Sequence, residues 1–378
     1  MRGILRIAYK LLTNDKGKFA ALLLGITFSV FLMVQMTSMF AGMMKRASAT
    51  VTNTGAKVWV MDRAVNNVAN AIPMPEYVLD VARSVSGVKY AVPIFSAVGL
   101  AHLPDGTYQA VTVIGLDDNS LFGRPALIDG RIEDIYAENG FFLVKDEEVP
   151  KLKNPGMGSE FEINDHRCRI VGIAKVPSSG LFGLPTLYTT YSRAIQYVPT
   201  MRYTISFVLV EPGSAAAVAL LKAEMARLGY DALTEQEFID RITNFYMFHT
   251  GMGTNMMLMT LISFIVGLSI SGQTFYTFVL ENLEKFGALK AIGAKGRELV
   301  AMILAQVSLT SLAGYGLGIG LCALLIALAR LQMPDYASVI TFRNLGLALG
   351  MVLLIAASSA WLAVRRVLRI DPFDIFRS

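Results

Sequence analysis

The 378-residue sequence is poor in the residues and motifs that carry catalytic or redox chemistry. It holds three scattered histidines and only two cysteines, Cys168 and Cys322, which are too few for a disulfide framework. It contains no Walker A, GxSxG, HExxH or CxxC motif, so the motif-based routes to nucleotide, serine-hydrolase and zinc chemistry are excluded. We therefore expect a chain that is not an enzyme and that binds no metal and no cofactor of its own.

Charged residues are almost absent from four long apolar runs. Each run is long enough to cross a bilayer, which takes about 20 residues in a helix. With a hydrophobic content of 54% and a mean hydropathy of +0.50, the runs predict a membrane protein. The scarcity of ionisable side chains argues against a proton- or ion-coupled relay through the spans. The runs are Phe19–Met44, Met256–Val279, Leu299–Leu328 and Leu345–Val364.

The spans also contain residues that favour contacts between helices. Gln35 and Gln306 favour hydrogen bonding between helices over a substrate path. Methionines crowd the first two spans, and two interpretations stay open: an adaptable surface for a hydrophobic substrate or a partner copy, or simple filler. The third span is rich in small residues that let helices approach closely. These are Gly314, Gly316, Gly318 and Gly320, with Ser308 and Ser311.

The short charged segments predict the topology. Residues 1–18, 281–298 and 365–378 together carry 13 Lys and Arg against six Asp and Glu, whereas residues 45–250 carry 19 against 22. By the positive-inside rule, we expect both termini and the central loop in the cytoplasm and the long segment outside. The net charge of +5 therefore reflects topology and does not predict binding to nucleic acid.

These observations predict a membrane α-helical fold with four transmembrane helices and a large α+β extracytoplasmic domain between the first and second spans. Such a chain would be a multi-pass protein of the inner membrane. The expected order is a cytoplasmic amphipathic helix (1–18), transmembrane helix 1 (19–44), the extracytoplasmic domain (45–253), transmembrane helix 2 (254–280), a cytoplasmic coupling helix (281–298), transmembrane helix 3 (299–330), transmembrane helix 4 (345–364) and a cytoplasmic tail (365–378).

The first 18 residues predict a helix that lies on the inner leaflet, since one face is apolar and another is basic. An alternative is the charged start of a signal peptide, because Ala47-Ser48-Ala49 resembles a cleavage site. Against it, an apolar run of about 25 residues is longer than the apolar core of a signal peptide. The apolar face consists of Ile4, Leu5, Ile7, Ala8, Leu11 and Leu12.

The long segment alternates strand and helix patterns. This order resembles a porter-like α+β unit (45–117 and 201–250) interrupted by an inserted β-rich subdomain (118–200). Thr234-Glu235-Gln236-Glu237 then begins a helix that leads towards the second span. If that helix is unbroken, domain and membrane helix would move as one rigid rod. The predicted strands include Val58–Met61, Lys89–Ala101, Thr107–Leu116, Gly140–Val144 and Thr204–Val210, and the predicted helices include Pro75–Val85 and Ser214–Leu228.

Residues 281–298 lie between the second and third runs. Phe286, Leu289 and Ile292 recur at helical spacing, which predicts a short helix with an apolar face and a charged face. Gly293-Ala294-Lys295-Gly296 predicts its end. Such a helix suits docking into a groove on a soluble partner. The plainer interpretation is that any short cytoplasmic loop must be basic and must turn, in which case these side chains would face lipid headgroups.

The segment from Glu284 to Ala294, EKFGALKAIGA, resembles the cytoplasmic motif of the MacB/FtsX-like (type VII) ABC transporter permease family. With residues 274–283 added, it is most similar to the DevC and hemin-exporter branches. Residues 361–376, with Asp371-Pro372, resemble the basic tail of the same family. One position departs, because the family often has Glu where this chain has Lys285, so the resemblance implies no single charge pair.

The resemblance implies the permease subunit of an ABC exporter that works by mechanical transmission. A dimer of a separate ATPase would bind ATP and Mg²⁺ and would dock on the central helix, and a second permease copy would complete a homodimer. A hydrophobic or amphiphilic substrate would pass to a membrane fusion protein and an outer-membrane channel, or leave the outer leaflet directly as in the hemin-exporter branch. The implied docking residues are Glu284, Lys285, Phe286, Gly287, Ala288, Leu289, Lys290, Gly293 and Ala294. We expect the apolar side chains of Phe286 and Leu289 to leave water only when the ATPase binds.

A second class of function stays open. In FtsX, the same ATPase-driven arrangement regulates cell-wall hydrolases through the outer domain without transporting a substrate. The size of the outer domain and its insertion favour export. The neighbouring genes would discriminate between the two, because an ATPase with a fusion protein indicates export and an ATPase with a hydrolase indicates regulation.

Overall fold

The computed structural model describes residues 2–146, 148–176, 183–199, 203–333 and 336–368. The chain divides into two compact units, residues 1–42 with 252–378 and residues 43–251. We call the first the helical unit and the second the sheet unit. The predicted tail motif Asp371-Pro372 lies outside the described residues.

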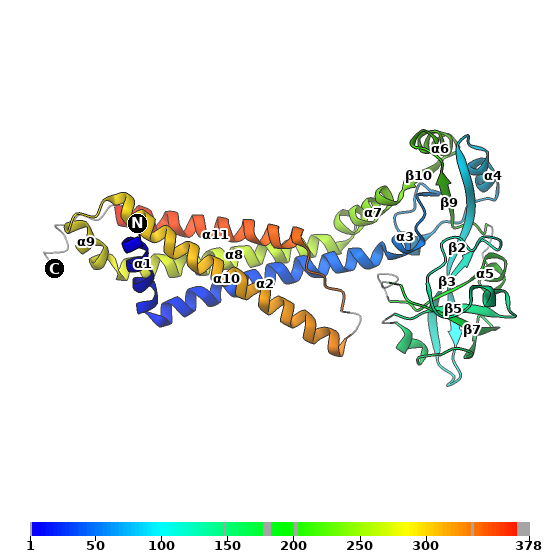
Figure 1. Cartoon of the computed structure of the whole chain (residues 1–378), viewed down its shortest axis with the longest axis horizontal. Helices are drawn as coiled ribbons and strands as arrows, with labels where there is room; N and C mark the ends of the chain where they lie inside the picture. The colour runs from blue at the N-terminus through cyan, green and yellow to red at the C-terminus, as the bar shows by residue number, and fades with distance from the viewer. Residues whose placement is uncertain (1, 147, 177–182, 200–202, 334–335, 369–378) are drawn as a thin grey trace. The chain divides into compact units, whose positions relative to one another are not determined.

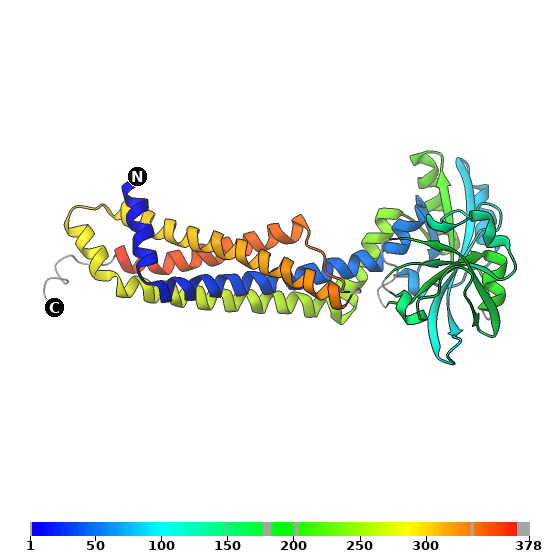
Figure 2. The same cartoon turned by 60° about the horizontal axis from the view of Figure 1, so that its bottom comes forward.

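Within the described residues, four helices are long and apolar enough to cross a membrane. They run side by side, as Figures 1 and 2 show, and they confirm the predicted number of spans and their order. Each helix extends beyond its apolar run, because polar residues at the ends continue the helical backbone. The four are α2 (Lys16–Ala47), α8 (Gly251–Glu281), α10 (Gly296–Gln332) and α11 (Phe342–Leu368), and two shorter helices are α1 (Arg2–Asn14) and α9 (Leu283–Ala291).

Polar side chains join the long helices. Ser29 Oγ donates to the Ser263 carbonyl at 2.7 Å, which connects α2 with α8. Gln35 accepts from Cys322 Sγ at 3.3 Å and donates to the Tyr336 hydroxyl, which connects α2 with α10 and the following loop. These bonds satisfy groups that would be costly to bury unpaired. The predicted role of Gln35 between helices is therefore confirmed.

The first helix packs on the other helices through part of its apolar face, and its predicted place on the inner leaflet stays a prediction. Ala8 and Leu12 are fully buried among side chains of the other helices. Gln306 in α10 donates from Nε2 to the Ala8 carbonyl at 2.9 Å, so the predicted helix-to-helix role of Gln306 is also confirmed. Burial of an apolar stripe against neighbouring helices explains the amphipathic pattern as well as a membrane surface does.

A ten-stranded sheet forms the centre of the sheet unit, in the order β10-β1-β9-β2-β3-β8-β5-β7-β4, with β6 paired to β2 and β7. The strands are β1 (Val58–Asp62), β2 (Val88–His102), β3 (Tyr108–Leu116), β4 (Leu127–Gly130), β5 (Gly140–Val144), β6 (Glu160–Ile163), β7 (His166–Ala174), β8 (Thr186–Thr190), β9 (Phe207–Pro212) and β10 (Tyr230–Thr234). The helices are α3 (Ala49–Thr54), α4 (Tyr77–Ser84), α5 (Tyr191–Tyr197), α6 (Ala215–Leu228) and α7 (Glu235–Asn244), with short turns η1 (Val68–Asn70), η2 (Ile132–Tyr136), η3 (Val149–Leu152) and the π-helix η4 (Phe245–His249).

Two apolar cores lie along this sheet, and the long strand β2 runs through both. The first core packs α4 and α6 against β1, β9 and the start of β2 (Figure 1). The second core contains Val111 and Val113 of β3 together with Phe141 and Leu187. β3 pairs with β2 on one side and with β8 on the other, so it joins the predicted porter-like part to the predicted β-rich part, and the boundary at 117/118 stays a prediction.

The connection between α7 and the second span is not one α-helix. Five residues of π-helix, Phe245–His249, follow α7. Thr250 then adopts an extended conformation, with φ −119° and ψ 157°, before α8 begins at Gly251. A residue outside helical geometry breaks the hydrogen-bond ladder. The condition for a single rigid rod is therefore not met.

Candidate functional site

The helix α9 and the turn after it form a compact unit between the second and third spans. Asn282 Nδ2 donates to the Phe278 carbonyl at 2.8 Å, and the Phe286 N–H donates to the Asn282 carbonyl at 3.0 Å. The helix ends where Gly293 adopts φ +103°, a conformation that glycine reaches without steric cost. The Lys295 N–H then donates to Glu298 Oε2 at 2.9 Å and begins α10. The predicted helix and its end are both present.

One face of α9 is buried within the chain itself. Phe286 is 0% exposed and belongs to a cluster with side chains from α1, α2, α8, α10 and α11, and Leu289 packs against the same cluster. The hypothesis that Phe286 leaves water only on docking is therefore wrong, because this chain already supplies its apolar surroundings. Phe286 anchors α9 to the helical unit.

The opposite face of α9 is exposed. Ala288, Ala291 and Ile292 lie at positions i, i+3 and i+4 on one side of the helix, and Ile292 is 84% exposed. Glu284 and Lys285 flank them and are exposed too. Ile292 is missing from the residues that the motif implied for docking. Its helical spacing was visible in the sequence, but the spacing could not show which apolar residues turn inward.

The other predicted docking residues divide between these faces. Gly287 is buried, Gly293 is exposed, and Lys290 and Ala294 are half-buried. The Lys285 ammonium donates to Asn282 Oδ1 at 2.8 Å. At the start of α2, Lys18 pairs with Asp15 at 3.0 Å and with Glu281, which joins α2 to the end of α8. The exposed face thus carries both signs of charge around a small apolar centre.

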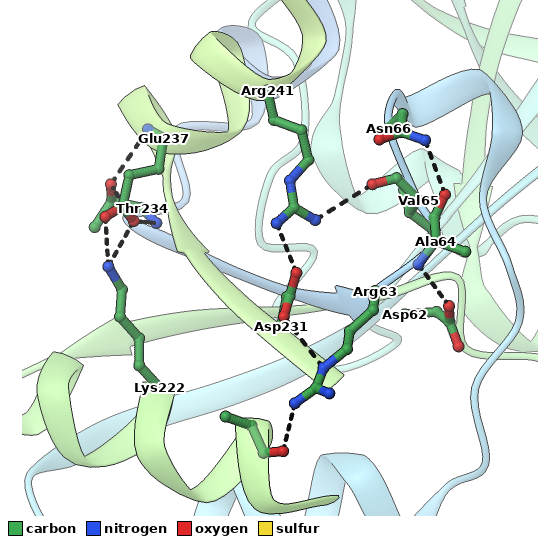
Figure 3. Close-up of polar contacts among 11 residues, drawn as sticks. Asp62, Arg63, Ala64, Val65, Asn66, Lys222, Asp231, Thr234, Glu237 and Arg241 are labelled. Atoms are coloured by element: carbon green, nitrogen blue, oxygen red, sulfur yellow. Dashed lines mark hydrogen bonds and ion pairs between the residues drawn. The ribbon is translucent and has the colours of Figure 1, made fainter. Parts of the chain in front are cut away.

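A second group of charges lies in the sheet unit, where α7 meets the strands (Figure 3). Asp231 in β10 receives Arg241 of α7 at 2.6 Å, and Arg63 approaches its other oxygen at 3.6 Å. Arg241 also donates to the Val65 carbonyl at 3.4 Å, and Arg63 donates to the Ala226 carbonyl at 2.5 Å. We call Arg63, Asp231 and Arg241 the Asp231 cluster. No sequence pattern indicates this cluster, because its members lie far apart in the chain.

The first turn of α7 is fixed by the residues that the sequence singled out. The Thr234 N–H donates to Glu237 Oε2 at 2.8 Å, and the Glu237 N–H donates back to Thr234 Oγ1 at 3.4 Å. The Lys222 ammonium lies 2.6 Å from both Glu237 oxygens. The hydrogen bond from Lys222 is the main reason that the pKa of Glu237 is lowered. The predicted helix start is confirmed.

An aromatic cluster completes the attachment of α7. Phe238 is fully buried, with its ring centroid 5.6 Å from that of Trp59 and 6.0 Å from that of Phe207. Aromatic packing of this kind adds to the free energy gained from burial alone. The helix that precedes the second span is therefore held to the sheet by apolar and ionic contacts at once.

Among the described residues, no group of three or more His, Cys, Asp or Glu side chains is arranged to hold a metal ion. Cys168 and Cys322 are both buried as free thiols. In the sheet unit, burial raises the pKa of the Cys168 thiol, which disfavours the reactive thiolate.

Two family models match the chain. The model described as the MacB-like periplasmic core domain matches residues 19–228, more than half of the chain. The model described as the FtsX-like permease C-terminal matches residues 256–372, which include most of α8 and all of α9 and α10.

Individual proteins match as well. The chain is 27% identical over 146 residues to a protein named hemin transport system permease protein HrtB from Staphylococcus haemolyticus (strain JCSC1435), a match that covers 39% of this chain and only 40% of that protein. It is 24% identical over 357 residues to an uncharacterized ABC transporter permease from Mycobacterium tuberculosis (strain CDC 1551 / Oshkosh), over 93% of each chain. The solved extracellular domain of the ABC-type transporter YknZ from Gram-positive bacteria aligns with a TM-score of 0.35 at 18% identity, covering 47% of this chain and 98% of that domain.

Proposed function

The chain belongs to the family of MacB-like and FtsX-like ABC transporter permeases, and we propose that it is the membrane subunit of an ABC exporter that works by mechanical transmission. A dimer of a separate ATPase binds ATP and Mg²⁺ and docks on α9 from the cytoplasm. Two permease copies pair along their first and second spans. ATP-driven movement of the spans displaces the sheet unit and drives export of a hydrophobic or amphiphilic substrate.

The observation that carries this proposal is the division of α9 into two faces. Phe286 fixes the helix to the helical unit, so a force applied to α9 acts on the spans. Ala288, Ala291 and Ile292 stay exposed at the spacing by which a helix inserts into a groove. An isoleucine that is 84% exposed gains free energy when a partner covers it. The docking face is therefore the Ile292 side of α9.

The contacts of α7 support transmission at the other end. The Asp231 cluster and Phe238 hold α7 to the sheet, whereas Thr250 departs from helical geometry before α8. In the proposal, a change of angle at Thr250 passes to α7 and from there to β10 and β1. The family names of the relatives describe permeases, which agrees with a membrane subunit that leaves hydrolysis to a partner.

Co-purification of the partner ATPase with the permease tests the docking face. Ile292→Asp should lower ATPase recovery about tenfold or more, because covering one large apolar side chain is worth about 1.5–3 kcal/mol. Leu331→Asp is the matched control. Leu331 is 81% exposed, but it lies in the last turn of α10, at the opposite end of that helix from α9. Normal membrane insertion is verified for both. Recovery of the ATPase with Ile292→Asp at the wild-type level would contradict the proposal.

A further inference from the structure

A groove of about 1020 Å³ opens in the sheet unit, away from the Asp231 cluster. It is large enough for a small molecule, since ligand pockets are usually about 300–1000 Å³. Its walls come from β2, from the loop that follows β3, and from the segment around β4 and η2. We call it the Arg124 groove, and the residues that define it are Tyr90, Phe122, Arg124, Leu127, Arg131 and Ile132.

The apolar part of the Arg124 groove is formed by an aromatic pair. Tyr90 and Phe122 meet edge to face, with ring centroids 5.3 Å apart. Tyr90 is 41% exposed and Ile132 is 38% exposed, so large apolar surfaces face solvent on the groove wall. Such a surface gains free energy when an apolar body covers it.

The basic part of the Arg124 groove is incompletely neutralised. Arg131 lies 3.5 Å from Glu133 in an exposed pair, which contributes little. Among the described residues, no carboxylate pairs with the exposed guanidinium of Arg124. A guanidinium presents a planar set of donors that matches a carboxylate, sulfonate or phosphate group. The groove therefore complements an anion at one place and an apolar body beside it.

The loop that carries Phe122 and Arg124 is fixed before any ligand arrives. Asp117 Oδ2 accepts from the Ser120 N–H at 2.9 Å and from its hydroxyl at 2.7 Å, and the Arg124 N–H donates to the Leu121 carbonyl at 3.1 Å. Gly123 has φ +81°, and a Cβ there would lie 2.7 Å from Thr54 Cγ2. A preformed loop loses less conformational entropy on binding.

We propose that the Arg124 groove binds an amphiphilic anion, whose apolar body lies against Tyr90, Phe122 and Ile132 and whose anionic group is held by Arg124. This inference rests on the proposed export function and specifies its substrate class: an amphiphile that carries negative charge. It places one binding step in the sheet unit, outside the membrane spans.

The test uses the full chain in phosphatidylcholine nanodiscs, without ATPase or ATP, and the fluorescent amphiphilic anion 1-anilinonaphthalene-8-sulfonate as the probe. The chain has two tryptophans, so Trp361→Phe leaves Trp59 of the sheet unit as the only energy-transfer donor. Probe binding is read as quenching of Trp59 emission. In this background, Arg124→Glu should weaken binding about tenfold or more, as loss of a charge-assisted bond and gain of repulsion require.

Two further variants and a displacement measurement complete the test. Arg167→Glu is the matched control, since Arg167 is also exposed but lies outside the groove, and this variant should bind the probe as the parent chain does. Phe122→Ala should weaken binding without any change of charge. Decanoate should displace the probe, whereas acetate should not. Unchanged binding by Arg124→Glu, equal weakening by Arg167→Glu, or equal displacement by acetate would each overturn the proposal. If probe binding fails these tests while Ile292→Asp still loses the ATPase in co-purification, the groove proposal is overturned and the proposed function is not.

Discussion

Phe286 in α9 and Ile292, which caps the C-terminal end of α9, lie six positions apart and have opposite surroundings. Phe286 is fully buried by the helical unit, and Ile292 is 84% exposed. Both are apolar and both fit the helical spacing, so the sequence predicted a helix with an apolar face but not which residue that face would bury. The choice is made by the packing of α1, α8, α10 and α11 around Phe286, and those contacts join residues distant in sequence.

Alanine substitutions should separate the two roles. Phe286→Ala removes a buried ring and should destabilise the helical unit by about 3–5 kcal/mol, as large-to-small core changes do. Ile292→Ala removes exposed atoms and should leave stability unchanged while weakening ATPase binding. Thermal unfolding of each purified variant measures its stability, and co-purification of the ATPase measures its binding. If Ile292→Ala unfolds at a lower temperature than wild type, Ile292 has a structural role and not the docking role proposed for it.

The Glu237 carboxylate should make the sheet unit sensitive to acid. Its pKa is lowered from 4.5, mainly by the hydrogen bond from Lys222 and then by the Thr234 N–H. A carboxyl whose folded pKa is depressed contributes stability above the unfolded pKa, and that contribution is lost as the pH falls through the folded value. Wild type should therefore have a higher midpoint temperature of unfolding than Glu237→Gln at neutral pH. The difference between the two midpoints should disappear as the pH falls through the lowered pKa of Glu237.

The control for this experiment is Glu235→Gln in the same helical turn, because the Glu235 side chain has no hydrogen-bond or ion-pair partner among the residues that the structure describes. At neutral pH, the midpoint temperature of Glu235→Gln should differ less from that of wild type than the midpoint temperature of Glu237→Gln does. If the difference in midpoint temperature between wild type and Glu237→Gln persists unchanged in acid, the ionised carboxylate is not what stabilises the start of α7.

At the scale of elements, strongly patterned segments were predictable and weakly patterned ones were not. β5 and α6 follow from their own sequences, since β5 is a run of five buried residues and α6 has Ser214 as its N-cap. β10 was missed, because only Ala232 in it is fully buried and the strand forms by pairing with β1. The Asp231 cluster depends on that strand. Sequence patterns therefore predicted the spans and α9, but not the long-range contacts that attach α7.

Two glycines of α10 offer a matched pair for testing how the spans pack. A Cβ on Gly318 would lie 2.7 Å from Val30 Cβ and 2.9 Å from the Thr27 carbonyl oxygen, whereas a Cβ on Gly316 would meet nothing within 4 Å. Gly318→Ala should destabilise the helical unit by about 1–3 kcal/mol through overpacking. Gly316→Ala should be neutral or stabilising, since alanine is favoured in a helix by about 1 kcal/mol.

Unfolding of the two variants in the same detergent measures the difference directly. The expected order of midpoint temperature is Gly316→Ala at or above wild type, with Gly318→Ala below both. Equal midpoints for the two variants would mean that α2 and α10 do not approach as closely at Gly318 as the structure describes.

At the scale of the whole molecule, the arrangement of charge along the chain is the basis for its predicted topology. The four long helices indicate four membrane crossings, and the basic excess in residues 1–18 and 281–298 predicts their direction. The long segment between α2 and α8 carries a slight acidic excess, and long segments translocate largely regardless of charge. The proposed ATPase docking requires α9 inside, so topology and function must agree.

Single-cysteine labelling in intact cells tests this agreement. Cys168 and Cys322 are both buried, so the native thiols contribute little background to a membrane-impermeant maleimide. Ser159→Cys, in the sheet unit, should react from outside, and Lys295→Cys, in the exposed turn after α9, should react only after the cells are opened. The expected pattern places the sheet unit and α9 on opposite sides of the membrane. Labelling of Lys295→Cys from outside would invert the topology, remove α9 from the reach of a cytoplasmic ATPase, and refute the docking of an ATPase on Ile292 even if every contact within the helical unit is correct.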